Sequence, residues 1–187
     1  MPFTKFAYLA AGSVCALAAI VGTVWILSDD GGGPSPAPSA LRVDGNDATI
    51  AMTTDGEAGS FLLGPLCTSG PEAVKILKVE PARRQGRVEI SDFSAVPSKQ
   101  TEGFPAAEKG RLKDFPQFEG ATSVSGECPS GGEIPRMRLA VELTTRGDRA
   151  FAQHLKVTYL TAGRTRVVDM AINLGICKVA YPCRPTP

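Results

Sequence analysis

Apolar residues follow two different patterns along this chain. Residues 6–27 form one unbroken run without a charged side chain. As a helix rising ~1.5 Å per residue, this run spans roughly 33 Å, which matches a bilayer core of ~30 Å. After residue 40 the apolar residues occur in short segments bounded by Gly, Pro, Asp or Ser, a pattern typical of β-strands.

The charges that flank the apolar run predict its orientation. Lys5 precedes the run and Asp29 and Asp30 follow it, and the positive end of such a segment stays in the cytoplasm. We therefore expect residues 1–5 to be cytoplasmic, residues 6–27 to form a single-pass transmembrane anchor in the cell membrane, and the remainder to be extracytoplasmic. A cleaved signal peptide is the alternative, but the run is longer than a typical signal-peptide core and its best small-x-small site lies inside it.

A linker and one domain follow the predicted anchor. Residues 28–40 are rich in Gly, Pro and Ser, a composition that gives a flexible to extended stalk. Residues 41–187 have the length of one ordinary domain. The whole chain carries 20 Lys and Arg against 19 Asp and Glu residues, so its bulk charge indicates no partner.

The domain reads as all-β. Seven segments are rich in β-branched and aromatic residues: 48–52, 59–63, 73–79, 87–93, 137–143, 155–160 and 166–172. Alternation in the segment 137–143 predicts a strand with one buried face and one wet face, the wet face carrying Arg138, Ala140 and Glu142. Gly163 predicts a hairpin turn between the last two segments. We expect an Ig-like antiparallel β-sandwich, with a barrel as the alternative.

Cys67, Cys128, Cys177 and Cys183 all fall in the part expected outside the membrane. An even set of cysteines in an oxidising compartment predicts two disulfides. The close ligand pairs of a zinc site and a redox C-x-x-C are absent, so we predict no metal and no cofactor. Three pairings are open. If the strand before Cys67 lies parallel to the last strand, as first and last strands often do in Ig-like sandwiches, Cys67 pairs with Cys177 and Cys128 with Cys183.

Sequence motifs of catalysis are absent. His154 is the single histidine, so any Ser-His-Asp or Cys-His mechanism must use it. Its phase places it with Lys156 and Thr158 on the expected wet face. The chain contains no Ser-x-x-Lys dyad, G-x-S-x-G elbow, phosphate loop or dinucleotide fingerprint. We expect a protein that is not an enzyme; a hydrolase without a readable motif is the alternative, since a glycosidase needs only two carboxylates.

Arg83, Arg84 and Arg87 cluster between two predicted strands, within residues 82–87. Such a cluster can hold an anionic polymer or a lipid headgroup, and a solvated hairpin tip is the alternative. Because no aromatic residues are interleaved with these arginines, we expect no nucleic-acid binding.

The segment 97–117 is the longest departure from the strand pattern, and loops of this length are often functional. It places the apolar residues Phe104 and Phe115 among cations that include Arg111 and Lys113, and we predict these four as candidate binding residues. Phenylalanines that pin the segment to its own domain are the alternative. A short helix after Pro105, over residues 106–115, is also expected.

In layout the chain resembles uncharacterised single-pass envelope proteins of GC-rich, actinobacteria-like bacteria. The most family-like runs are LGPLC, VKILKVEP and LKVTYLTAGRTRVVDMAINLGIC. This resemblance implies an envelope location and no particular activity. We expect a non-catalytic binding or accessory module that contacts the membrane through its helix and an envelope protein or a cell-wall polymer through its domain. A structural spacer is the alternative, and the sequence indicates no oligomeric state.

Overall fold

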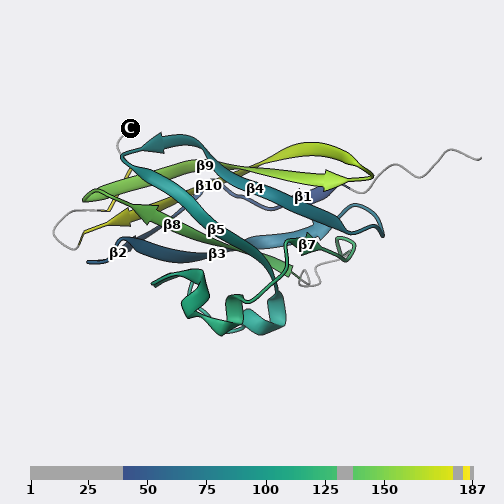
Figure 1. Ribbon diagram of the computed structural model, residues 1–187, viewed down its shortest axis with the longest axis horizontal. Helices are drawn as coiled ribbons and strands as arrows, with labels where there is room; N and C mark the ends of the chain where they lie inside the picture. The colour runs from purple at the N-terminus through teal and green to yellow at the C-terminus, as the bar shows by residue number, and fades with distance from the viewer. Residues whose placement is uncertain (1–39, 130–136, 179–182, 186–187) are drawn as a thin grey trace, which may run out of the picture. The chain divides into compact units, whose positions relative to one another are not determined.

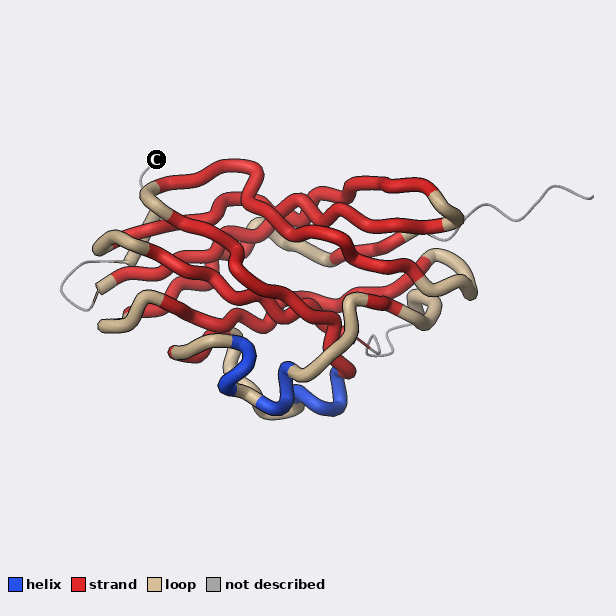
Figure 2. The backbone as a smooth tube through the Cα atoms, in the orientation of Figure 1, coloured by secondary structure: helices blue, strands red, loops and turns tan. Residues whose placement is uncertain are grey.

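Strands dominate the computed structural model, which describes residues 40–129, 137–178 and 183–185 (Figures 1 and 2). The predicted anchor, residues 6–27, lies outside the described residues, as does the linker apart from Ala40. Within the described ranges, no helix is long and apolar enough to cross a membrane.

The strands form two sheets (Figure 1). The first sheet has the spatial order β1 (Leu41–Val43), β3 (Ala58–Thr68), β8 (Met137–Thr145) and β5 (Val88–Pro97), and β6 (Ala107–Lys109) pairs with β3 as well. The second sheet has the order β2 (Ala48–Thr53), β10 (Arg164–Cys177), β9 (Arg149–Thr161), β4 (Val74–Gln85) and β7 (Ser123–Val124). All seven predicted segments lie in these strands to within one residue. The all-β prediction is confirmed.

The β9–β10 pair joins at the predicted hairpin. Thr161 pairs with Arg164, which leaves Ala162 and Gly163 as the turn. Their φ angles are 44° and 70°. Two positive φ angles match the right-handed twist of the flanking strands, so the turn continues the antiparallel ladder directly.

The core lies between the two sheets. Alternate residues of β8, among them Leu139, Val141 and Leu143, are fully buried there. They belong to one hydrophobic cluster with residues of the second sheet such as Val157 and Met170. The inward face predicted for β8 is therefore confirmed.

The opposite face of β8 is the first correction. Ala140 and Glu142 were expected to be wet but are 0% and 5% exposed. The reason is tertiary: the segment 98–118, which we call the lid, covers this outer face of the first sheet (Figure 2). The alternation within a strand cannot show that a segment distant in the sequence buries the strand's outer face.

The lid is not the predicted helix. It contains three 3-10 turns, η1 (Ser98–Thr101), η2 (Leu112–Asp114) and η3 (Pro116–Phe118), with β6 between the first two. Residues of β6 pair with the edge of β3, and Gly110 follows with φ 119°. A backbone that is extended and then has positive φ cannot continue as a helix.

Apolar residues of the lid pack on the first sheet in a second hydrophobic cluster, made of Leu62, Val96, Leu112, Phe118 and Ala140. Phe104 and Phe115 pack against this cluster and are partly buried. The rings of Phe104 and Phe118 meet edge to face with centroids 4.5 Å apart, and Phe115 lies 5.6 Å from Phe118. The three aromatic rings hold the lid onto its own sheet.

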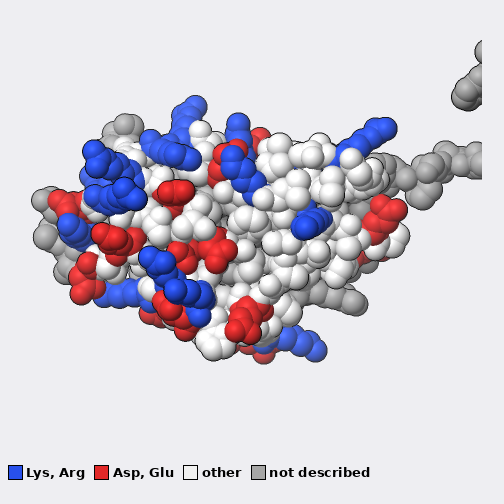
Figure 3. All heavy atoms as spheres, viewed as in Figure 1, with Lys and Arg blue, Asp and Glu red and all other residues white. Residues whose placement is uncertain are grey.

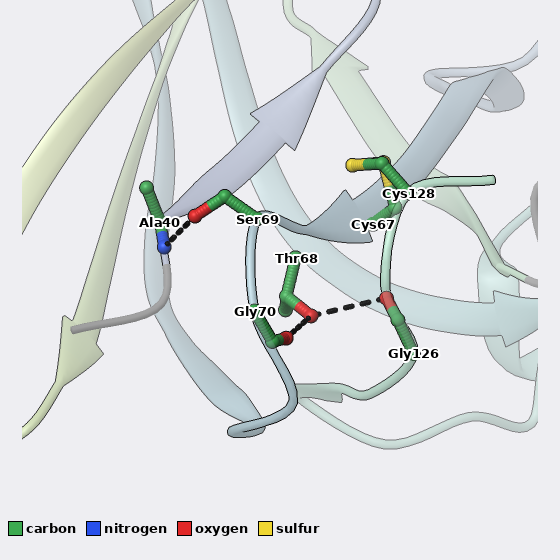
Figure 4. The surroundings of a disulfide bond; sticks show 7 residues. All are labelled: Ala40, Cys67, Thr68, Ser69, Gly70, Gly126 and Cys128. Atoms are coloured by element: carbon green, nitrogen blue, oxygen red, sulfur yellow. Dashed lines mark hydrogen bonds between the residues drawn. A yellow bond between two sulfur atoms is a disulfide. The ribbon is translucent and has the colours of Figure 1, made fainter. Parts of the chain in front are cut away.

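Two disulfides join Cys67 to Cys128 and Cys177 to Cys183. The prediction of two disulfides is confirmed, and the favoured pairing is wrong. The strand parallel to β10 is β2, whereas β3, which carries Cys67, lies in the other sheet. Around the first disulfide, Thr68 donates its hydroxyl to the carbonyl of Gly126 (Figure 4). The Cys67–Cys128 disulfide therefore connects the end of β3 with the segment that precedes β8.

Candidate functional site

The lid leaves one end of the outer face of the first sheet uncovered, and a cavity of about 530 Å³ lies there. Ala58, Thr144 and Glu89 are paired across β3, β8 and β5, so their side chains share this face. The volume falls within the roughly 300 to 1,000 Å³ of ordinary ligand pockets. We call it the arginine cavity.

Four arginines from three different segments line this cavity. Arg84 and Arg87 flank the β4–β5 turn, which Gly86 forms with φ 77°. Arg146 comes from the turn after β8, and Arg111 comes from the lid. In Figure 3 the Lys and Arg side chains gather, with Asp and Glu among them, toward the left end of the visible face.

None of these four guanidinium groups forms an ion pair with a described carboxylate. Glu57, Glu89 and Glu142 nevertheless line the same cavity. Arginine presents a rigid planar fork of donors that matches carboxylate and phosphate groups. The cavity walls thus present guanidinium groups that form no ion pair with any carboxylate in the described part of the chain.

Glu142 is the one charged residue among the buried side chains of the described chain. Its Oε1 accepts a hydrogen bond from Ser91 Oγ at 2.7 Å, and its Oε2 accepts one from the backbone N–H of Leu112 at 3.0 Å. Ser91 is the extra residue of a β-bulge in β5, where the register shifts between Ile90 and Asp92. Bulges of this kind redirect a side chain, and here the bulge places Ser91 at the carboxylate.

The same carboxylate holds the lid next to Arg111. Leu112, which donates to Glu142, directly follows Arg111 in the chain. The N–H of Arg111 donates to Asp114 Oδ2 at 3.0 Å, and the preceding carbonyl of Gly110 accepts from Ser60 Oγ at 3.0 Å. Hydrogen bonds between side chains and the lid backbone therefore hold this part of the lid beside the cavity, which Arg111 lines.

A smaller hollow of about 430 Å³ adjoins the arginine cavity. The two share Glu57, Ala58 and Arg111, and the second adds Lys109 and Asp55. Arg111 therefore lines both hollows.

The cavity and the start of the fold lie at opposite ends of β3. Ala58, the first residue of β3, lines the cavity, whereas Thr68, the last, pairs with Leu41 of β1. Ala40 and Ser69 exchange hydrogen bonds beside this pair (Figure 4). A strand rises ~3.3 Å per residue, so roughly 35 Å separates the two ends.

Of the four predicted binding residues, one lines the arginine cavity and three do not. Arg111 lines the cavity together with Arg84 and Arg87 of the predicted arginine cluster. Lys113 is exposed and is not part of the lining.

Phe104 and Phe115 pack within the lid, away from the cavity lining. Sequence reasoning missed Arg146 and Glu142. The first lies in a turn that carried no motif, and the second was assigned to the wet face.

A second polar group surrounds His154, which is exposed as predicted. Its Nε2 lies 3.7 Å from Asp47 Oδ1, and the backbone N–H of His154 donates to Asn173 Oδ1 at 3.3 Å. Both His154 and Asp47 have positive φ, 49° and 53°, opposite an irregularity in β10. No serine or cysteine nucleophile contacts this histidine among the described residues, so the group lacks the parts of a catalytic triad.

Two pKa shifts occur outside the cavity. A hydrogen bond from Lys78 lowers the pKa of Glu80, and burial lowers the pKa of Arg138. Across the described part of the chain, no three His, Cys, Asp or Glu side chains group closely enough to hold a metal ion.

Comparison with protein-family models, curated proteins and solved structures finds no match for this chain.

Proposed function

We propose that the protein is a membrane-tethered, extracytoplasmic binding module that captures an anionic polymer of the bacterial envelope in the arginine cavity. The observation that carries this proposal is the set of four guanidinium groups around one hollow, none of which forms an ion pair with a described carboxylate. Guanidinium groups bind carboxylate and phosphate through paired hydrogen bonds, and such charge-assisted bonds are roughly twice as strong as neutral ones.

The proposed location rests on the sequence and is supported by the disulfides. Residues 6–27 are the anchor, residues 28–40 the stalk, and residues 41–187 the extracytoplasmic domain. Disulfides persist in oxidising compartments and are rare in the cytosol, which agrees with an external domain. The parallel pairing of β2 with β10, the last strand, supports the finer assignment of an Ig-like sandwich.

The position of the cavity suits a tethered receptor. The stalk joins the domain at β1, and the cavity lies at the far end of β3. A domain anchored in this way presents the cavity away from its point of attachment. Binding needs no catalytic group, and the proposed module is non-catalytic.

The test measures binding of the full chain, in neutral detergent, to poly(glycerol phosphate) and polygalacturonate as soluble models of anionic wall polymers. A variant with Arg84→Ala, Arg87→Ala and Arg111→Ala should bind the preferred polymer at least ~30-fold more weakly, because the loss of even one charge-assisted contact worth about 2 kcal/mol weakens binding by that factor. Arg83→Ala with Lys113→Ala is the matched control. These residues neighbour the cavity arginines in the sequence but are absent from the cavity lining, and their loss should change binding by about twofold at most.

Two outcomes would replace the proposal. If neither polymer binds, or if the control pair matters as much as the three cavity arginines, the structural spacer becomes the better description. Cleavage of a bound polymer that is lost in Glu142→Gln would favour the hydrolase, because Glu142 is the buried carboxylate of the cavity. Melting temperatures of all variants control for misfolding.

A further inference from the structure

The charges of the arginine cavity are mixed, although its arginines form no ion pair with a described carboxylate. Its lining contains four arginines and three glutamates, which leaves a surplus of a single positive charge. A polyanion with closely spaced charges would place some of them against Glu57, Glu89 or Glu142, and like charges at such short range repel. The lining therefore suits a ligand whose anionic groups are separated by uncharged, polar parts.

Glu142 adds a requirement for hydrogen-bond donors. A carboxylate offers about four acceptor positions, and Ser91 and the backbone of Leu112 occupy one on each oxygen of Glu142. A ligand group that pairs with one of the remaining positions must donate a hydrogen bond, because an ionised carboxylate has acceptors only. The two bonds from the protein hold the carboxylate in place. Thr144 and Thr145 line the cavity as well, and hydroxyl groups both donate and accept.

We infer that Glu142 is the specificity-determining residue of this cavity, and that the ligand is a hydroxyl-rich glycan or polyol polymer with about one anionic group per repeat. This inference rests on the proposed function and narrows it. The arginines bind the anionic group, and Glu142 accepts a hydrogen bond from a neighbouring ligand hydroxyl. An anion without hydroxyl groups leaves the acceptors of Glu142 unpaired, which costs binding free energy.

Two pairs of probes separate hydroxyl recognition from charge alone. Polygalacturonate and poly-L-glutamate each carry one carboxylate per repeat, but only the former has ring hydroxyls. Poly(glycerol phosphate) and inorganic polyphosphate both carry phosphate, but only the former has a polyol repeat with hydroxyl groups. The first pair tests a carboxylate source of the anion and the second pair a phosphodiester source.

For the full chain in neutral detergent, the hydroxylated member of at least one pair should bind roughly tenfold or more tightly than its partner at equal charge concentration. Equal or tighter binding of both poly-L-glutamate and polyphosphate overturns the inference and leaves the proposed function standing. Binding of none of the four polymers ends both. Tight binding of poly-L-glutamate alone would instead indicate an acidic protein partner.

Glu142→Gln tests the assigned residue, because it keeps the size of the side chain and removes its charge. We expect the preferred hydroxylated polymer to bind roughly tenfold more weakly and its unhydroxylated partner more tightly. These opposite changes cannot arise from a loosened lid, which would weaken both. Glu102→Gln, an exposed lid carboxylate outside the cavity lining, is the matched control and should change neither.

Parallel weakening of both polymers in Glu142→Gln, with the melting temperature of the parent, overturns the specificity role. If Glu142→Gln does not fold, Ser91→Ala replaces it. That change removes one donor to Glu142 and frees an acceptor position. It should favour the hydroxylated polymer further; a shift toward the unhydroxylated one contradicts the inference.

Discussion

At the scale of single residues, Glu142 connects the fold to the candidate site. Its carboxylate is buried and bonds to a bulge residue on one side and to the lid backbone on the other. Burying a charge is costly unless hydrogen bonds compensate it, and two bonds do so here. A polar residue in this position fixes the lid in one place, and with it the position of Arg111.

Gly175 occupies a position at which the structure leaves no room for a side chain. It pairs with Phe151 across β9 and β10, and a Cβ at this position would overlap the phenylalanine ring, which is fully buried. Gly175→Ala should therefore destabilise the fold by about 1–3 kcal/mol, as overpacked sites do. Urea unfolding measures the change.

Gly147→Ala is the control for this substitution. A Cβ there would meet no atom closer than 4.0 Å. We expect a change within about 0.5 kcal/mol, as for ordinary surface sites. Equal effects of the two substitutions would show that the ring of Phe151 does not lie over Gly175.

At the scale of elements, the lid converts an exposed sheet face into a second buried layer. Phe118 is 3% exposed, whereas Phe104 and Phe115 are only partly buried around it. All three rings meet edge to face, a geometry that adds to the gain from burial. The contacts favour the interpretation that these phenylalanines pin the lid, and a role as partner anchors stays a prediction.

Phe118→Ala should detach the lid. Truncating a buried phenylalanine costs about 3–5 kcal/mol, so hydrogen exchange of the Leu112 amide, which donates to Glu142, should accelerate strongly. Phe104→Ala and Phe115→Ala should have smaller effects because their side chains are partly exposed.

Phe104→Ser with Phe115→Ser separates the two roles. If the Leu112 amide keeps its protection while capture of an envelope partner is lost, the phenylalanines are anchors. If protection falls, they are pins. Lys113→Ala, at an exposed residue of the same lid, should leave exchange unchanged.

Local patterns predicted the strands well and the lid poorly. The alternation in 137–143 reports which residues can face a core, and Leu139 and Val141 do so. It carries no information about Ala140 and Glu142, whose burial depends on a segment about 30 positions away in the chain. Arg84 and Arg111 could each be proposed as binding residues, but only the fold brings them, with Arg146, around one cavity.

At the scale of the whole molecule, the two disulfides constrain very different lengths of chain. Cys67 and Cys128 are 61 positions apart, and the loop they close contains β4, β5 and the lid. Cys177 and Cys183 are 6 positions apart. The sequence predicted the state of these cysteines from the compartment expected for them, but their pairing depends on which strands become neighbours.

Removing the Cys67–Cys128 disulfide should lower the free energy of unfolding more than removing the Cys177–Cys183 disulfide. In the loop-entropy relation, Cys67→Ser with Cys128→Ser loses about 4 kcal/mol and Cys177→Ser with Cys183→Ser about 2 kcal/mol. Thermal unfolding of the two double variants under the same conditions compares them. If the Cys177–Cys183 variant instead lost more stability, residual structure in the unfolded chain would already restrict the long loop between Cys67 and Cys128.

The position of β3 between stalk and cavity has a mechanical consequence. If the proposed function holds, a pull between a bound polymer and the membrane enters at Leu41 of β1, beside Thr68, and leaves at the cavity end of β3, so the force is directed along the axis of this strand. The hydrogen bonds to β8 lie across that axis and resist in shear, all together, instead of opening one after another. Force also passes along the chain from β1 to β2, and there it loads the β2–β10 pair in shear in the same way. In the proposed tethered receptor, this arrangement of strands would let the domain hold a ligand under tension.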